Sequence, residues 1–218
     1  MSRIRAGRVA QVDYLDRGRR NLNPEGVPLL SLLAEDLRTH DRSIGEVGLW
    51  ALATHRVGNW THGLPRPLRL GLRPGIRGLA KLVEVTSGIS LPLTTRVGRR
   101  VRLWHHGGMV LEASAIGDDV HIRHNTTFGI RERDQVGAIP VIEAGADLGT
   151  GVSVLGAVRV GRDARVGAHA VVLDDVPDGA TAVGVPARVV RRAEASRPAD
   201  REVPSDRDPS VPRRVGSG

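Results

Sequence analysis

The chain has 218 residues, enough for one domain with a substantial core or for a small domain joined to a repeat structure. It contains no cysteine, so disulfides, thiolate metal ligands and a thiol nucleophile are excluded. The net charge of +8 comes almost entirely from arginine, and only 2% of the residues are aromatic. Because base stacking needs aromatic side chains, this basic charge does not favour a nucleic-acid-binding protein.

Residues 1–22 are polar and rich in arginine, and they predict a flexible N-terminus. Their basic start is not followed by an apolar run, so we expect no secretion signal. No later stretch holds 18 apolar residues without a charge, so we expect no transmembrane segment. Together these features predict a cytoplasmic protein.

Residues 23–87 predict a helical region with three helices. The first begins at Asn23 and Pro24, because asparagine caps free helix amides and proline is tolerated at the first helical position. The second follows a capping box formed by Ser43 and Glu46, and the third runs from 68 to 85 with a break or kink near Pro74. The side chains expected to face the core are Leu29, Leu30, Leu33 and Leu37 in the first helix and Ile44, Val47, Trp50, Ala51, Thr54 and Val57 in the second.

A basic stripe runs along the third predicted helix. It consists of Arg66, Arg69, Arg73, Arg77 and Lys81. Such a stripe is usually the solvated face of a helix, and the alternative is contact with an acidic partner or a membrane surface.

Between residues 88 and 192 an aliphatic residue, often followed by glycine, recurs every six residues. A period of six is too short for a helical repeat and is typical of a parallel β-helix, in which each hexad forms one side of a triangular coil. We therefore predict a mainly β fold after the helical region. The repeated positions, with one slip between the third and fourth, are Val97, Leu103, Met109, Ile116, Ile122, Phe128, Ile142, Leu148, Val154, Val160, Val166 and Val172.

Two segments depart from this period. Residues 130–141 are too long for one side of the coil and predict an excursion loop with a functional or interfacial role, the alternative being a disordered insertion. Residues 193–218 have almost no apolar side chains to bury and predict a disordered tail.

The adjacent histidines at 105 and 106 are compatible with a catalytic base, a metal site or no special role. Residues three hexads apart stack one strand spacing, about 4.8 Å, from each other. Residues counted in this way from His105 form a column along one edge of the coil. The column changes from histidines to small residues, which fits a long, thin ligand with its reactive end at the histidines. An ordinary row of surface side chains has the same pattern. The residues counted along the edge are His105, His124, Thr150, Ala168 and Pro186.

A metal site at this edge is the weaker reading. His105, His106, His121 and His124 offer nitrogen ligands, but neighbouring residues of a strand point to opposite sides. No carboxylate lies beside them in the sequence, so we predict no metal.

The hexad run, the histidine before Gly107 and Gly108, the excursion and the ending AVGVPARVV resemble the serine acetyltransferase family of hexapeptide-repeat acyltransferases. The resemblance covers roughly residues 27–192. It implies a left-handed β-helix over 88–192, a homotrimer that can pair into a dimer of trimers, and acetyl-CoA as the co-substrate, bound between neighbouring subunits. It also implies that His105 is the general base for the acceptor hydroxyl. The positions that it implies for coenzyme binding are Gly149, Thr150, Arg165, Ala168, Gly184, Pro186 and Arg188.

The chain also departs from the family pattern. Trp104 stands where the family has a carboxylate, and Ser90 where it has the aspartate that orients the histidine. His124 can partly replace that orienting group, so we place it with His105 in the catalytic set. In the excursion, Ala138 and Ile139 replace the pair that holds an amino acid's carboxylate.

The resemblance implies acetyl transfer from acetyl-CoA to the hydroxyl of L-serine, a step of cysteine biosynthesis. Backbone amides near Gly107 and Gly108, or in the excursion, are expected to stabilise the oxyanion. One alternative is an acceptor hydroxyl on a sugar, polysaccharide or specialised metabolite, since IRHNTTFG (122–129) resembles sugar-acetylating enzymes. Another is a non-catalytic trimeric scaffold.

Overall fold

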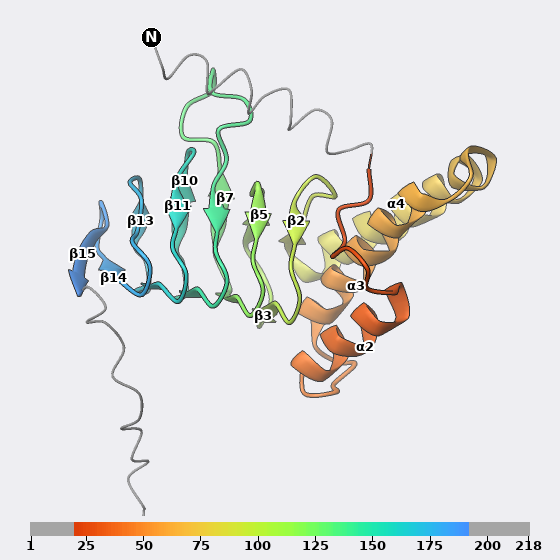
Figure 1. Cartoon of the computed structure of the whole chain (residues 1–218), viewed down its shortest axis with the longest axis horizontal. Helices are drawn as coiled ribbons and strands as arrows, with labels where there is room; N and C mark the ends of the chain where they lie inside the picture. Colours follow the sequence, from red (N-terminus) through yellow and green to blue (C-terminus); the bar gives the residue numbers. More distant parts are fainter. Residues whose placement is uncertain (1–19, 192–218) are drawn as a thin grey trace, which may run out of the picture.

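The structure is a computed structural model, and it describes residues 20–191. Helices at one end lead into a coil of short strands (Figure 1). The helical elements are α2 (Leu29–Thr39), α3 (Val47–Trp60), the 3₁₀ turn η1 (Thr61–Gly63) and α4 (Arg66–Ser87). The prediction of a helical region followed by a parallel β-helix is confirmed. The N-terminus up to residue 19 and the tail predicted over 193–218 lie outside the described residues.

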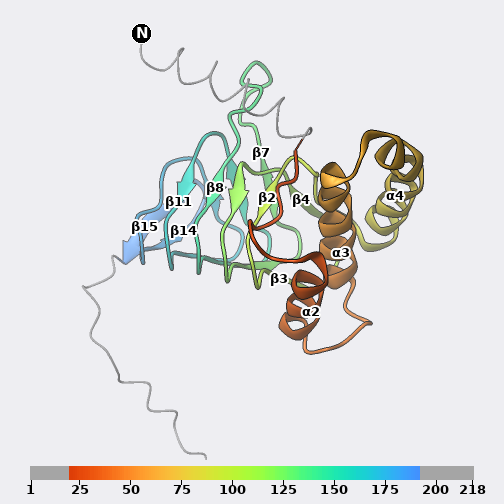
Figure 2. The same ribbon diagram turned by 45° about the vertical axis from the view of Figure 1, so that its right-hand side comes forward.

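The strands form three parallel sheets, one for each side of the coil (Figure 2). The first sheet contains β1 (Ile89–Ser90), β4 (Met109–Leu111), β7 (Thr127–Gly129), β10 (Ser153–Leu155) and β13 (Val171–Val172). The second contains β2 (Arg96–Val97), β5 (Ala115–Ile116), β8 (Val141–Ile142) and β11 (Arg159–Val160). The third contains β3 (Arg102–Trp104), β6 (His121–Arg123), β9 (Asp147–Leu148), β12 (Arg165–Val166) and β14 (Thr181–Val183), and it ends with the antiparallel β15 (Arg188–Arg191).

The core of the coil consists of the repeated aliphatic residues. All twelve of the positions named above are buried, none more than 3% exposed. The glycines that follow them lie where successive turns come closest. A Cβ on Gly117 would lie 2.5 Å from the amide nitrogen of Ala144, and one on Gly149 would lie 2.6 Å from that of Ala168. Gly117 and Gly149 are therefore required by the close approach of the turns.

The hexad count was wrong at one corner. Leu103 pairs with Ile122 as predicted, but Phe128 pairs with Leu111 and not with Met109. Trp104 pairs with Arg123, and Val110 pairs with Thr127. The connection from Trp104 to Val110 is therefore two residues longer than the equivalent connection from Arg123 to Thr127 in the next turn. The corner at residues 105–108 is therefore enlarged.

The count was also wrong in the last turn. Leu148 pairs with Val166, eighteen residues on, whereas Val166 pairs with Ala182, sixteen residues on. The connection after β13 is shorter, since the bridge from Val160 reaches Val176. Gly184, and not Pro186, consequently stands two residues after the paired position in this turn.

The first helix begins later than predicted, at Leu29. The Nδ2 atom of Asn23 donates to the Arg56 carbonyl at 2.9 Å, so this side chain joins two segments and caps no helix. Leu30 is 79% exposed, and Leu32 is the buried leucine of α2. Leu22 is also buried, so the ordered chain extends into the segment expected to be flexible.

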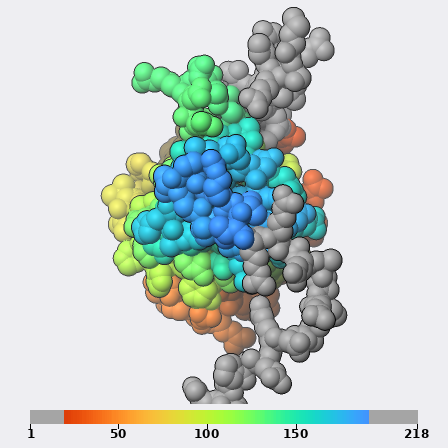
Figure 3. All heavy atoms as spheres, turned by 90° about the vertical axis from the view of Figure 1, so that its left-hand side faces the viewer, coloured from red at the N-terminus to blue at the C-terminus, as the bar shows by residue number. Residues whose placement is uncertain are grey.

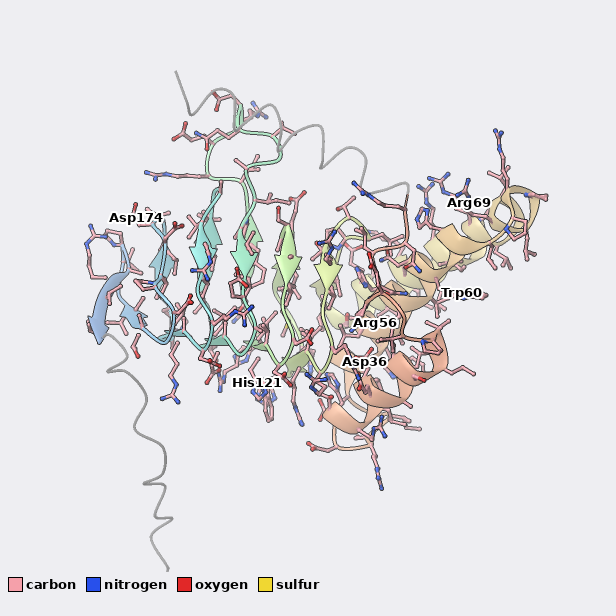
Figure 4. All side chains as sticks on the ribbon, viewed as in Figure 1. Asp36, Arg56, Trp60, Arg69, His121 and Asp174 are labelled. Atoms are coloured by element: carbon pink, nitrogen blue, oxygen red, sulfur yellow. The ribbon has the colours of Figure 1, made fainter. Side chains whose placement is uncertain are left out.

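The buried face of α3 is more polar than predicted. Trp50 and Ile44 are exposed, whereas His55, Arg56 and Asn59 are buried. Arg56 pairs with the buried Asp36 at 3.1 Å and donates to the carbonyls of residues 97 and 98 at 2.7 and 2.6 Å. The pair lies between the helices and the first turn, as Figure 4 shows. It fastens the helical region to the end of the coil.

The third helix, α4, runs without a break from Arg66 to Ser87, with Pro74 inside it. Of the predicted break or kink near Pro74, the break is therefore absent. In the described part of the chain no helix combines the length and apolar character needed to cross a membrane. The excursion leaves the coil after β7, returns at β8 and projects from the body (Figure 3).

Candidate active site

The candidate site lies at the corner where the third sheet passes into the first. Several residues here have left-handed backbone conformations, which are costly for side chains other than glycine. His105 is one of them, with φ of 65°. The others along the corner are Gly107, Gly108, Asn125, Gly151, His169 and Gly184.

Hydrogen bonds join this corner from turn to turn. The amide of Asn125 donates to the Gly107 carbonyl at 3.1 Å, and the amide of Gly151 donates to the His124 carbonyl at 3.0 Å. The amide of His169 donates to the Thr150 carbonyl at 2.7 Å. The strand register thus places His105, His124, Thr150 and Ala168 along one edge, as predicted.

The two histidines predicted to act together are neighbours. Their rings meet edge to face with centroids 5.5 Å apart. His105 is exposed, while His124 is half-buried and its Nδ1 atom is buried with no partner among the described residues. The second ring is therefore held against the first and has a nitrogen available for a further hydrogen bond.

An aromatic and cationic wall borders His105. The Trp104 ring lies 6.5 Å from the His105 ring, and its Nε1 donates to Nδ1 of His121 at 3.4 Å. The Arg102 guanidinium stacks 3.8 Å above the indole, which is a cation–π contact, and it also donates to the Thr39 carbonyl at 2.6 Å. The end of α2 thus positions the indole through Arg102. Figure 4 shows His121 on the outer face of the coil.

Comparison with known proteins identifies the family. No protein-family model matches the chain. The serine acetyltransferase of Escherichia coli K12 is 31% identical over 185 residues, which are 81% of this chain and 66% of that enzyme. Soybean serine acetyltransferase complexed with serine is 32% identical, with a TM-score of 0.63 over 74% of this chain and 69% of that one. This chain belongs to the serine acetyltransferase family.

A further family structure, a serine acetyltransferase in complex with CoA, matches with a TM-score of 0.56 at 25% identity. The match covers 86% of this chain and 74% of that one. The chain spans just under two thirds, 66%, of the E. coli relative.

Three positions that differ from the serine acetyltransferase pattern do not form a group of polar side chains around His105. Ser90 lies in β1, paired with Val110 of β4. Ile139 is only 4% exposed, so its side chain is buried and not available to a ligand. Ala138 is half-buried and carries no polar group.

The positions that the family resemblance implies for coenzyme binding differ in their exposure, in their hydrogen bonds and in their place along the edge. The Gly149 amide donates to the Val166 carbonyl at 2.8 Å, so that amide is already used within the sheet. Arg165 and Ala168 are exposed near the predicted edge, and Arg188 lies 3.8 Å from Asp174. Pro186, as described above, is displaced from the edge, and Gly184 takes its place.

His105 is exposed on the single chain. One cavity of about 240 Å³ lies between α3, α4 and residues 89–93, and another of about 400 Å³ lies between residues 20–25 and the second sheet. Neither is lined by His105 or His124. Among the described residues no three histidine or acidic side chains are grouped closely enough to hold a metal ion.

Proposed function

We propose that the protein is an acetyl-CoA-dependent O-acetyltransferase in which His105 is the general base. The observation that carries the proposal is the exposed, left-handed His105 at the enlarged corner of a serine acetyltransferase coil. The imidazole takes the proton of the acceptor hydroxyl while the hydroxyl oxygen attacks the thioester carbonyl carbon. The C–S bond of the tetrahedral intermediate then breaks, and the imidazolium returns the proton to the sulfur of CoA.

We assign His124 to the positioning of His105. Its ring contacts the base edge to face, and its buried Nδ1 atom is within the same corner. A side chain that fixes the imidazole of the base has the same role as the orienting carboxylate of the family pattern. This assignment gives His124 an effect on turnover rather than on coenzyme affinity.

The oxyanion of the intermediate needs a backbone donor. The Gly107 amide donates to the Ser87 carbonyl at 2.9 Å, so it is engaged. No hydrogen bond among the described residues uses the Gly108 amide, which makes it the preferred donor in this turn.

Acetyl-CoA lies, in this proposal, along the edge that runs from His105 past Thr150 and Ala168. The small side chains leave room for the pantetheine arm, and Arg165 and Arg188 supply guanidinium groups for the phosphates. A second chain of a homotrimer encloses the otherwise open edge. The family structure in complex with CoA supports this placement. We place the reaction in the cytoplasm.

L-serine is the first candidate acceptor, since a family structure was solved in complex with serine, and the reaction then belongs to cysteine biosynthesis. A sugar hydroxyl is the second candidate, and a specific observation favours it. The indole of Trp104 borders His105, and aromatic rings stack on the apolar faces of sugars, whereas Ile139 is buried and offers nothing to a carboxylate.

The test is a thiol-release assay with acetyl-CoA and L-serine, homoserine, sugars or nucleotide sugars. We expect CoA release with one acceptor class and a loss of roughly 10²–10⁴-fold in kcat for His105→Ala. His106→Ala, which changes an exposed neighbour, is the matched control and should keep its rate. Equal rates for His105→Ala and the wild type would reject the assigned base. CoA release with none of the acceptors would favour the scaffold.

A further inference from the structure

The third sheet forms one side of the corner that carries His105, and the carboxylates on this side are already paired. Asp147 of β9 forms an ion pair with Arg123, and Asp41, which follows the end of α2, forms one with Arg102. An ammonium group that gave up its water at this side would gain no ion pair in return. Such a loss of hydration without compensation is costly.

The first sheet forms the other side of the corner, and its outward row has no charged side chain. This row, in which the residues pair from turn to turn, is Ser90, Val110, Thr127, Ser153 and Val171. A further carboxylate, that of Glu46 directly before α3, acts on the Arg102 guanidinium, which Asp41 already holds. In the described part of the chain, neither sheet thus presents an unpaired carboxylate at this corner.

Trp104 adds a rigid apolar surface at the same place. The guanidinium of Arg102 covers one face of the indole, and the indole Nε1 donates to His121, so the ring is held from two sides. The side chain is still only half-buried, and its ring lies 6.5 Å from that of His105. A fixed aromatic ring offers a large apolar contact area at little cost in side-chain entropy. The C–H groups on one face of a sugar ring can pack against such a surface.

We infer that the acceptor is a sugar without an ammonium group and that Trp104 determines this specificity. The inference rests on the proposed acetyl transfer with His105 as the base, and it ranks the sugar above L-serine, whose ammonium group finds no partner at the corner. The sugar oxygen forms the ester bond to the acetyl carbon as the C–S bond breaks. The hydroxyl proton passes through His105 to the sulfur of CoA.

The first experiment compares acceptors that differ in the ammonium group. CoA release by the full chain is measured with D-glucosamine and N-acetyl-D-glucosamine, and with L-serine and N-acetyl-L-serine, and the O-acetylated product is identified by mass spectrometry. In each pair, loss of the positive charge should raise kcat/KM. We expect N-acetyl-D-glucosamine to exceed L-serine in kcat/KM by at least about tenfold.

The second experiment changes Trp104. Trp104→Leu should lower kcat/KM for N-acetyl-D-glucosamine by roughly tenfold and leave that for L-serine unimproved. Trp104→Asp replaces the indole with a carboxylate beside the base, so the ratio of the two kcat/KM values should shift toward L-serine by about 100-fold or more. Trp60→Leu, at the exposed tryptophan that ends α3, is the matched control and should keep both values. An unchanged KM for acetyl-CoA in all three variants separates acceptor specificity from a general loss of structure.

The possible failures are distinguishable. If L-serine is the best acceptor and its rate depends on His105, the inference is wrong and the proposed function stands. If Trp104→Asp keeps the wild-type preference, Trp104 does not determine specificity. CoA release with none of the acceptors would reject the proposed function, and this inference with it.

Discussion

Arg56 is a charged side chain with 0% exposure, and four contacts compensate its burial. Two carboxylate oxygens of Asp36 and two carbonyl oxygens of the first turn surround the guanidinium. Removal of one partner of such a pair leaves the other charge buried and uncompensated. The free-energy cost of this removal exceeds the net stabilisation that the intact pair provides. The helical region therefore depends on this contact for its attachment.

We predict that Arg56→Met lowers the free energy of unfolding by about 3–5 kcal/mol, measured by urea denaturation. The same substitution at Arg159, whose ion pairs with Glu143 and Asp178 are exposed, should cost at most about 1 kcal/mol. Equal losses in the two variants would contradict the role given to the buried pair.

His55 gives a prediction about pH. Burial, with the neighbouring charge of Arg56, lowers the pKa of His55 from 6.5 to about 3. The folded protein keeps this imidazole neutral while the unfolded chain binds a proton below pH 6.5, so the stabilisation is complete above that pH and is lost as the pH falls toward 3.

Between pH 7.5 and 5.5, His55 should contribute a loss of about 1.4 kcal/mol in the free energy of unfolding. His55→Gln should flatten the pH dependence by that amount, whatever its effect at pH 7.5. His106→Gln, at an exposed position, should keep the wild-type slope. A wild-type slope in His55→Gln would place the pH dependence elsewhere.

The burial of the pair formed by Asp36 and Arg56 was not predicted from the sequence. Apolar periodicity assigns polar side chains to the surface, and Asp36 and Arg56 are paired across two helices with no local pattern that joins them. The apolar Trp50 and Ile44 were expected inside for the same reason, and they are exposed. In a small helical region the buried face is set by the first turn of the coil against which it packs.

At the level of the strands, prediction succeeded because the coil repeats one requirement every six residues. Each hexad must send an apolar side chain inward, and all twelve such positions are buried. The errors fall where a corner changes length without changing that pattern. Met109 and Leu111 are both buried, so the apolar pattern alone cannot show that Leu111 is the one stacked on Phe128.

The close approach of the turns predicts the effect of Gly117→Ala. Its Cβ would lie 2.5 Å from the backbone nitrogen of Ala144, which cannot move without breaking the ladder. We expect a loss of roughly 1–3 kcal/mol in the free energy of unfolding. Gly129→Ala is the control, since a Cβ there meets no atom within 4 Å. A neutral Gly117→Ala would mean that the turns are less tightly stacked than the structure shows.

The candidate site was predictable to the same extent as the coil. Four of the five residues placed along the edge share it, because each stands two residues after a buried apolar residue of the third sheet, and these apolar residues pair from turn to turn. Pro186 does not, because the shortened last turn has no sequence signal that a hexad count can detect. Arg102 and His121 were not expected to hold Trp104, although alternation along a strand places Arg102 and Trp104 on one face.

At the scale of the whole molecule, the excursion is separable from the coil. Phe128 and Ile142 are fourteen residues apart, eight more than the regular spacing, and the strands on both sides of the loop keep their pairing. Removal of residues 131–138 restores the regular spacing and retains Ile139, which is buried.

We expect this deletion to shift the thermal midpoint by no more than about 3 °C, which corresponds to roughly 1 kcal/mol. If the loop has the functional role expected of it, kcat/KM in the thiol-release assay should fall at the same time. A large loss of thermal stability would show that the loop is part of the fold.

The two ends of the coil are closed in different ways. The helices cover the first turn through Arg56, and at the other end a shortened turn leads into β15, which runs against the direction of every other strand. A parallel stack with bare ends exposes unpaired amides and carbonyls, on which further molecules can add in register. Here the last strand of the third sheet is antiparallel, so that sheet presents no matching parallel edge at the C-terminal end of the stack. This arrangement opposes end-to-end addition of further molecules along the third sheet.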